Sequence, residues 1–272
     1  RRGRRMSADH APSQALAEVL ATIGPVAVAV SGGVDSMTLA HVAHDTVGRA
    51  AEIYHAISAA VPREATDRVR RHADVNGWNI HIVDAGETTD ERYLENPVNR
   101  CFFCKSNLYG FIDAVTDQQI VSGTNTDDLG DYRPGLEAAA EHAVRHPFVE
   151  AGIDKNAVRG IARDLALDDL AELPAAPCLS SRIETGIRVT PKRLSTVDVI
   201  ERHLRERVAA PNLRCRIRAT GVVIEVDETH VSEVRDRHAV ELRNLLATLD
   251  MPGKLTFEPY RRGGAFLHEG ES

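Results

Sequence analysis

The sequence has few cysteines, no long hydrophobic run and no apolar segment after its basic start. Four cysteines in 272 residues are too few for a disulfide-stabilised scaffold, so we expect reduced thiols. No stretch approaches the roughly 18 consecutive apolar residues of a transmembrane helix. The first five residues, Arg-Arg-Gly-Arg-Arg, lack the following apolar segment of a secretory signal. We therefore expect a cytoplasmic protein with no membrane partner.

An excess of basic residues is also missing. There are 33 lysines and arginines against 40 aspartates and glutamates, for a formal charge of −7. Four of the basic residues stand in the first five positions, so the rest of the chain is more acidic still. A duplex-binding protein needs a broad basic face to neutralise phosphates. We therefore expect no nucleic-acid partner.

The first half of the chain alternates short apolar runs with amphipathic segments. The apolar run at 26–30 is rich in valine, as in a strand that is buried on both faces of a parallel sheet. Further strands are expected at 51–58, 79–84 and 119–122, and helices at 37–47 and 63–76. This alternation predicts an α/β fold with a doubly wound parallel sheet, whose ligands bind at the carboxyl ends of the strands.

The second half predicts a smaller α+β domain. Helical spacing at 152–167 ends the first domain. Helical spacing then recurs at 191–208, strand patterns at 213–218 and 221–226, and a helix at 230–249 precedes a last strand at 255–257. We expect a disordered extension at 1–13, a first domain at 14–172 and a second domain at 173–272. The twelve histidines show no metal-ligand spacing along the chain.

A phosphate-binding motif stands between the first predicted strand and its helix. Its sequence is Ser31-Gly32-Gly33-Val34-Asp35-Ser36. A glycine pair lets successive N–H groups point into one cavity, and the helix N-terminus adds partial positive charge. Taken alone, the glycine pair could also form a simple turn between strand and helix that binds no ligand. The string does not fit the GxxxxGK[ST] pattern of Walker-type nucleotide-binding proteins.

Three later motifs contain most of the cysteines. They are Asn-Arg-Cys-Phe-Phe-Cys-Lys at 99–105, Gly-Thr-Asn-Thr-Asp-Asp at 123–128 with Arg-Pro-Gly at 133–135, and Pro-Cys-Leu-Ser-Ser-Arg at 177–182. Together with the phosphate motif they resemble the LarE family, ATP-dependent sulfur transferases of the PP-loop ATP pyrophosphatase superfamily. The resemblance runs from about residue 14 to the tail, where Tyr260-Arg261 and Gly263-Gly264 echo the family.

The resemblance implies a complete reaction. A carboxylate of pyridinium-3,5-biscarboxylic acid mononucleotide attacks the α-phosphate of ATP, and sulfur then displaces AMP to give a thiocarboxylate for the nickel-pincer nucleotide cofactor. It implies that Asp35 assists Mg²⁺, which prefers carboxylate and phosphate oxygens. It also implies a homo-oligomer, with a hexamer allowed, a nickel-insertion partner of the same pathway, and a second domain for sulfur transfer and oligomerisation. The ATP and pyrophosphate residues implied are Ser31, Gly32, Gly33, Val34, Asp35, Ser36, Asn125 and Asp128.

The sulfur source is open between two family types. In one, Cys178 gives up its own sulfur and becomes dehydroalanine. In the other, Cys101, Cys104 and Cys178 hold a [4Fe–4S] cluster whose open iron carries a spare sulfide, and a C-x-x-C pair with a distant third cysteine suits three-thiolate ligation. A zinc site and ordinary core thiols are alternatives. Cys215, between two arginines, is interpreted as a small buried hydrophobe.

Basic and acidic residues supply further candidates. Guanidinium groups fit phosphate oxygens, which makes arginines candidates for binding the substrate phosphate or pyrophosphate. That set is Lys105, Arg182, Arg214 and Arg216. Asp127 beside Asp128, and Glu201 and Glu225, are candidate metal or nucleotide contacts, although each of the two glutamates could equally be a surface charge. Two other functions stay open: another PP-loop enzyme, either a tRNA thiolase or an ammonia-dependent amide synthetase, and a non-catalytic ATP-binding regulator.

Overall fold

A computed structural model describes residues 11–130, 133–174, 177–251 and 253–261. The chain divides into two compact units. The first comprises the described residues within 1–58, 63–87 and 101–176, and the second those within 59–62, 88–100 and 177–272. The expected extension lies largely outside the described residues, and the first helix begins at Ala11, before the expected domain start.

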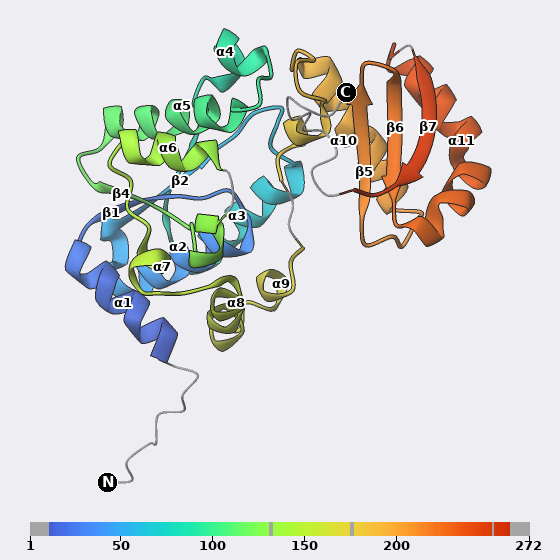
Figure 1. Cartoon of the computed structure of the whole chain (residues 1–272). Helices are drawn as coiled ribbons and strands as arrows, with labels where there is room; N and C mark the ends of the chain where they lie inside the picture. Colours follow the sequence, from blue (N-terminus) through green and yellow to red (C-terminus); the bar gives the residue numbers. More distant parts are fainter. Residues whose placement is uncertain (1–10, 131–132, 175–176, 252, 262–272) are drawn as a thin grey trace. The chain divides into compact units, whose positions relative to one another are not determined.

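The first unit contains an all-parallel sheet with helices on both faces (Figure 1). Its strands are β1 (Val26–Ala29), β2 (Ala51–Ala56), β3 (Asn79–Val83) and β4 (Gln119–Ser122), in the order β3-β2-β1-β4. The main helices are α1 (Ala11–Ile23), α2 (Val34–Val47), α3 (Arg63–Asn76), α5 (Arg100–Val115), α6 (Pro134–Glu141) and α8 (Lys155–Asp164). Shorter helices are α7 (Pro147–Glu150) and α9 (Asp168–Ala171), with 3₁₀ turns η2 (Gly48–Ala50), η3 (Glu87–Thr89) and η4 (Thr126–Gly130). The predicted α/β class and doubly wound parallel sheet are confirmed.

The residues of β1 explain the two layers of helices. Val26 and Val28 point to one face, where they pack with α1, α2, α3 and α8, whereas Ala27 and Ala29 point to the other face, against α5 and α6. All four side chains are buried, which accounts for the continuous apolar run. Because successive side chains of a strand alternate in direction, the larger valines and smaller alanines define a thick and a thin layer of core.

The strand order creates a switch point beside β1. The chain proceeds from β1 to β2 and β3 on one side, and β4 then adds on the other side of β1 in parallel register, with Ala29 opposite Ser122. In open α/β sheets, ligands bind in the crevice outside the carboxyl ends of such neighbouring strands. The loops after β1 and β4 are therefore the expected place for a ligand.

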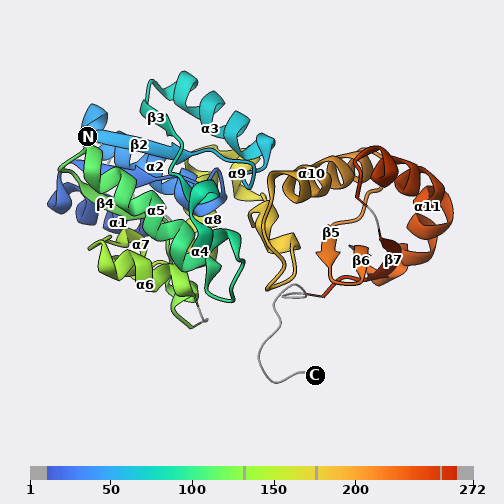
Figure 2. The same cartoon turned by 90° about the horizontal axis from the view of Figure 1, so that it is seen from above.

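The second unit is a three-stranded sheet covered by two long helices (Figure 2). Its strands are β5 (Leu213–Arg218), β6 (Gly221–Val226) and β7 (Lys254–Pro259), with β5 antiparallel and β7 parallel to β6. The helices are α10 (Pro191–Arg205) and α11 (Val231–Thr248), which lie on the same face of the sheet. Short elements are α4 (Glu91–Leu94), η5 (Leu179–Arg182) and η6 (Glu228–His230). This unit also takes in the chain around α4, which we had assigned to the first domain.

The two faces of the β5–β6 hairpin differ in chemistry. Leu213, Cys215 and Ile217 are buried and stand opposite Val226, Ile224 and Val222, which makes one apolar face. The intervening residues Arg214 and Arg216 share the other face, as their spacing predicted. Cys215 is a buried thiol whose pKa burial raises well above the usual value, and its interpretation as a small core residue is confirmed. Within the described residues no helix is long and apolar enough to cross a membrane.

A buried histidine pair makes the first unit sensitive to acid. His41 of α2 lies 2.9 Å from His72 of α3 (Nε2 to Nδ1), and His72 Nε2 lies 3.0 Å from the carboxylate of Asp169. Burial, reinforced by the neighbouring His72, lowers the pKa of His41 to about 4. The unfolded chain therefore binds more protons than the folded one between about pH 6.5 and 4, and stability falls as the pH falls through this window.

The wild-type protein should lose free energy of unfolding between about pH 6.5 and 4, and we expect His41→Gln to reduce this loss by roughly 2–3 kcal/mol. Urea unfolding of wild type and His41→Gln at a series of pH values measures this difference. Equal slopes for wild type and His41→Gln would contradict the assignment.

Candidate active site

The loop after β1 has a backbone that requires glycine. Gly32 has a φ of +81°, and a Cβ there would lie 2.8 Å from the carbonyl oxygen of Ala65. Arg68 Nη1 donates to the Gly32 carbonyl at 2.7 Å, which fixes the loop against α3. The Ser31 N–H donates to Ser36 Oγ at 3.0 Å, closing the loop on itself. The predicted phosphate motif is therefore a tightly held strand-to-helix turn.

The N-terminus of α2 opens at this turn. Gly33 is its N-cap residue and offers no side-chain hydrogen bond to the first N–H groups of the helix. Those donors and the positive end of the helix dipole suit an anion. Ser31 Oγ and Ser36 Oγ, 3.1 Å apart, lie beside the same turn.

The end of β4 comes within van der Waals contact of the α2 N-terminus. At Gly123 a Cβ would lie 2.7 Å from the backbone nitrogen of Ser36 and 2.9 Å from the carbonyl carbon of Asp35. Real Cβ atoms are not found so close to backbone atoms, so only glycine allows the two loops to meet here. This contact brings the second predicted motif, 123–128, against the first.

Charged and amide groups from three segments meet at Asp35. Asn125 Nδ2 donates to Asp35 Oδ1 at 3.4 Å, and Lys155 Nζ at the start of α8 lies 2.5 Å from Asp35 Oδ2. The backbone N–H of Asn125 donates to Asp128 at 3.1 Å, and Asp128 pairs with Arg133 at 2.7 Å. The predicted residues Asp35, Asn125 and Asp128 are thus brought together.

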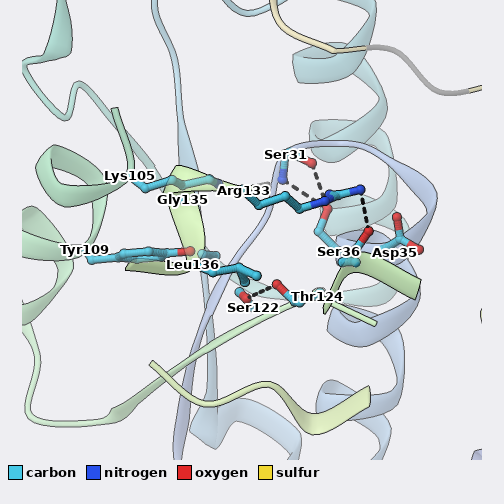
Figure 3. A pocket seen from close by; sticks show the side chains of 13 residues that line it. Ser31, Asp35, Ser36, Lys105, Tyr109, Ser122, Thr124, Arg133, Gly135 and Leu136 are labelled. Carbon is cyan, nitrogen blue, oxygen red and sulfur yellow. Dashed lines mark hydrogen bonds and ion pairs between the residues drawn. The ribbon is translucent and has the colours of Figure 1, made fainter. Parts of the chain in front are cut away.

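A cavity of about 250 Å³ lies between these loops (Figure 3). Its cationic lining is Lys105 from α5 and Arg133 before α6, and its hydroxyl lining includes Ser31, Ser36 and Thr124. Lys105 Nζ also lies 5.8 Å from the centre of the Tyr109 ring. Lys105, predicted as a phosphate contact from its place beside the cysteines, is therefore in the same cavity as the phosphate loop.

Sequence reasoning missed Lys155, Arg68 and Tyr109. Lys155 lies 120 positions after Asp35 and belongs to no recognisable motif. Asp127 was predicted to act together with Asp128, but the two carboxylates have different partners. The Asp127 carboxylate accepts a hydrogen bond from the backbone N–H of Lys155 at 3.2 Å, whereas Asp128 pairs with Arg133.

The Cys178 loop, in the second unit, is held by two arginines. Arg182 Nη1 donates to the carbonyl oxygens of Pro177 at 2.7 Å and Cys178 at 3.2 Å, and Arg216 Nη1 donates to the Ser181 carbonyl at 3.0 Å. Arg182 is 2% exposed and Arg216 is 5% exposed. Cys178 itself is half-buried. The two guanidinium groups therefore shape the loop that presents the Cys178 thiol.

The acids predicted as metal contacts are the partners of these arginines. Glu201, with no exposed surface, accepts from Arg182 Nε at 2.9 Å and from the Cys215 N–H at 3.1 Å, and it also pairs with Arg205. Glu225 accepts from Arg216 Nε at 2.8 Å and from Arg218 at 2.7 Å. Their oxygens neutralise buried guanidinium groups, a role that competes with binding a cation.

Arg214 differs from the other two predicted arginines. Its guanidinium lies 5.7 Å from the ring centre of Tyr260, and Nη1 donates to the neighbouring Leu213 carbonyl. Burial, followed by the positive charge of Arg182, lowers its pKa. Of the three arginines predicted to bind phosphate, Arg182 and Arg216 bind buried carboxylates and the Cys178 loop, whereas Arg214 lies against the Tyr260 ring.

A third arginine, Arg100, also contacts the Cys178 loop. This residue is in the second unit, immediately precedes Cys101, and donates from Nη1 to the Ser180 carbonyl at 3.1 Å. Cys101 and Cys104, in the first turn of α5, are both half-buried and lie three positions apart, on one side of the helix.

Comparison with known proteins agrees with these motifs. No protein-family model matches the chain. It is 35% identical over 238 residues to an uncharacterized protein of Synechocystis sp., covering 83% of this chain and 88% of that protein. It is 27% identical over 249 residues to pyridinium-3,5-bisthiocarboxylic acid mononucleotide synthase of Lactiplantibacillus plantarum, covering 88% and 90% of the two chains.

The chain belongs to the LarE family. A third relative, an uncharacterized protein of Methanocaldococcus jannaschii, is 28% identical over 142 residues, 51% of this chain. Matches of this length extend over parts of both units.

In this LarE-family chain, Arg182 is expected to be essential for stability because Glu201 is buried beside it. Removing one partner of a buried pair leaves an uncompensated charge, so Arg182→Met should lower the free energy of unfolding by about 3 kcal/mol. Arg205→Met removes the exposed partner of the same glutamate and should cost less than about 1 kcal/mol. Urea unfolding followed by circular dichroism measures both, and equal losses would show that Arg182 is not the dominant partner.

Proposed function

We propose that this protein is an ATP-dependent sulfur transferase that converts a carboxylate of pyridinium-3,5-biscarboxylic acid mononucleotide into a thiocarboxylate. The observation that carries the proposal is the cavity between the β1 and β4 loops, where helix-terminal N–H groups, three serines and two cationic side chains surround one space. The relative named pyridinium-3,5-bisthiocarboxylic acid mononucleotide synthase, which matches across both units, supplies the substrate class.

The first step transfers AMP to the substrate. A carboxylate oxygen attacks the α-phosphorus of ATP, the bond from that phosphorus to the bridging oxygen breaks, and pyrophosphate leaves. The phosphate loop holds the departing pyrophosphate, while Lys105 and Arg133 offset the negative charge that develops on its oxygens. The resulting acyl-adenylate has a good leaving group in place of a poor one.

Asp35 and Asp128 are the residues that would hold Mg²⁺. Their carboxylates lie at the cavity, and Mg²⁺ is usually bound by one or two carboxylates together with substrate phosphates. The ion would take the place of their partly exposed partners, Lys155 and Arg133. When bound, the ion supplies further neutralisation of the phosphate charge. In this structure Lys155 Nζ lies 2.5 Å from one carboxylate oxygen of Asp35.

The second step forms the carbon–sulfur bond. A sulfur nucleophile adds to the acyl carbon, the bond to the AMP oxygen breaks, and AMP leaves. The half-buried thiols of Cys101, Cys104 and Cys178 are the candidates for this chemistry, whereas Cys215 has no exposed surface. Three thiolates are a donor set that fits an iron–sulfur cluster, which would supply a spare sulfide. Arg214 is the proposed contact for the substrate phosphate.

Gly123→Ala tests the phosphate site. Its Cβ would collide with the Ser36 nitrogen, displace the loop and weaken nucleotide binding by about tenfold or more, because strain of 1–3 kcal/mol falls on the binding conformation. Gly160→Ala, on α8, has no atom within 4 Å of the added Cβ and should bind like wild type. Isothermal titration with ATP measures both affinities, and unaltered binding by Gly123→Ala would refute the site.

The cysteines are tested by single-turnover assays of thiocarboxylate formation in anaerobically purified protein. Cys178→Ala should abolish product, and Cys215→Ala, a buried control, should retain it. Cys101→Ala distinguishes the sources: loss of iron–sulfur absorption together with product indicates a cluster. Retained product with a mass loss of about 34 Da, one H₂S, at Cys178 indicates that Cys178 donates its sulfur. Full activity of Cys178→Ala would contradict either source.

A further inference from the structure

Three metal-ligating side chains converge where the two long helices of the second unit face each other. His203 is near the end of α10, and His238 and Glu241 are one turn apart on α11. One ligand atom from each, two imidazole nitrogens and a carboxylate oxygen, all lie within 4.8 Å of one another. The histidines show no metal-ligand spacing along the chain, and this cluster is not visible in the sequence because 35 positions separate His203 from His238.

The two histidine–glutamate separations are close to those between ligands of a tetrahedral metal site. His203 Nε2 lies 3.2 Å from Glu241 Oε1, and His238 Nδ1 lies 3.7 Å from Glu241 Oε2. Ligands 2.0–2.2 Å from a zinc ion are about 3.3–3.5 Å apart when tetrahedral. The three ligand atoms, all within 4.8 Å of one another, would need to close by little more than about 1 Å to hold one ion.

One imidazole nitrogen of each histidine is buried and has no well-formed hydrogen bond among the described residues. His203 and His238 side chains are 15% and 14% exposed, and neither His203 Nε2 nor His238 Nδ1 has a hydrogen-bond partner of acceptable geometry among the described residues. Buried polar atoms are normally hydrogen-bonded, so such atoms call for an explanation. Glu241 is half-exposed, which leaves a route to solvent. Both nitrogens are turned toward the single carboxylate that a cation would share with them.

We propose that His203, His238 and Glu241 bind a divalent transition-metal ion, with zinc as the reference case. Two imidazoles and one carboxylate are a known zinc ligand set that leaves the fourth position to water. Nitrogen ligands favour zinc, nickel, cobalt or copper, whereas Mg²⁺ and Ca²⁺ prefer oxygen ligands alone. The site is separate from the acids predicted as metal contacts, because Glu201 and Glu225 are paired with arginines.

The ion would link α11 to the helix that supports the Cys178 loop. Glu201 precedes His203 by two residues, about 200° around α10, and so faces the opposite side. There it pairs with Arg182, which donates to the Cys178 carbonyl. Arg207 Nη1 donates to the His203 carbonyl, which fixes the end of the helix at the site. A bound ion therefore clamps the end of α10 and stabilises the second unit.

The test uses the full chain, stripped with a chelator and titrated with Co²⁺. We expect one equivalent whose visible spectrum indicates tetrahedral nitrogen and oxygen ligands, without the charge-transfer band that thiolate ligands give. The lack of a thiolate charge-transfer band distinguishes Co²⁺ at this site from Co²⁺ bound to the cysteines. His203→Gln and His238→Gln should each weaken binding about a hundredfold or more, since even groups outside a ligand set change metal affinity by 10–100-fold.

His230→Gln is the matched control. It lies at the start of α11 in the same unit, outside the cluster, and should bind Co²⁺ like wild type. Zn²⁺ should raise the thermal unfolding temperature of wild type and His230→Gln but not of His203→Gln or His238→Gln, which also shows that the variants fold. Absence of this equivalent in wild type, or its persistence in both variants, overturns the proposal.

Discussion

The approach of Gly123 to the N-terminus of α2 is the constraint on which the first site depends. β1 and β4 are parallel neighbours, so the loops that leave their carboxyl ends begin side by side. A residue without a side chain at Gly123 lets them touch, with a Cβ position only 2.7 Å from the Ser36 nitrogen. That contact carries Asn125 to Asp35 and closes the wall of the cavity around the first turn of α2. The anion-binding N–H groups and the cationic side chains therefore meet through backbone packing.

In the second unit the Cys178 loop is held by buried ion pairs, whereas the phosphate loop of the first unit is held by backbone packing. Arg182 and Arg216 donate to carbonyls of the Cys178 loop while their remaining donors are neutralised by Glu201 and Glu225. Such pairs add little net stability, but removal of one partner is costly, so they impose one arrangement on the loop. Glu201 belongs to α10, and this helix carries His203 on its opposite side. Helix α10 therefore connects the cysteine loop to the proposed metal site.

Local patterns predicted the fold and part of the site. The valine-rich strand, the amphipathic α3 and the β5–β6 hairpin were all predicted near their observed bounds, because burial periodicity is a property of neighbouring residues. The phosphate loop and its partners Asn125 and Asp128 followed from motifs. Lys155 could not be predicted, since its role comes from a contact across 120 positions. Glu201 and Glu225 were candidate metal contacts from the family resemblance, and the sequence does not show that arginines pair with them. The approach of His203 to His238 is likewise a contact between helices that the sequence does not show.

The central claim is that the cavity activates a carboxylate with ATP. The most direct measurement is the formation of AMP and pyrophosphate by the purified protein, with and without pyridinium-3,5-biscarboxylic acid mononucleotide. The account predicts that both products appear in equal amounts, that they require this substrate, and that Asp35→Ala abolishes them. ATP binding without AMP formation in the presence of the substrate, or release of ADP and phosphate in their place, would contradict it.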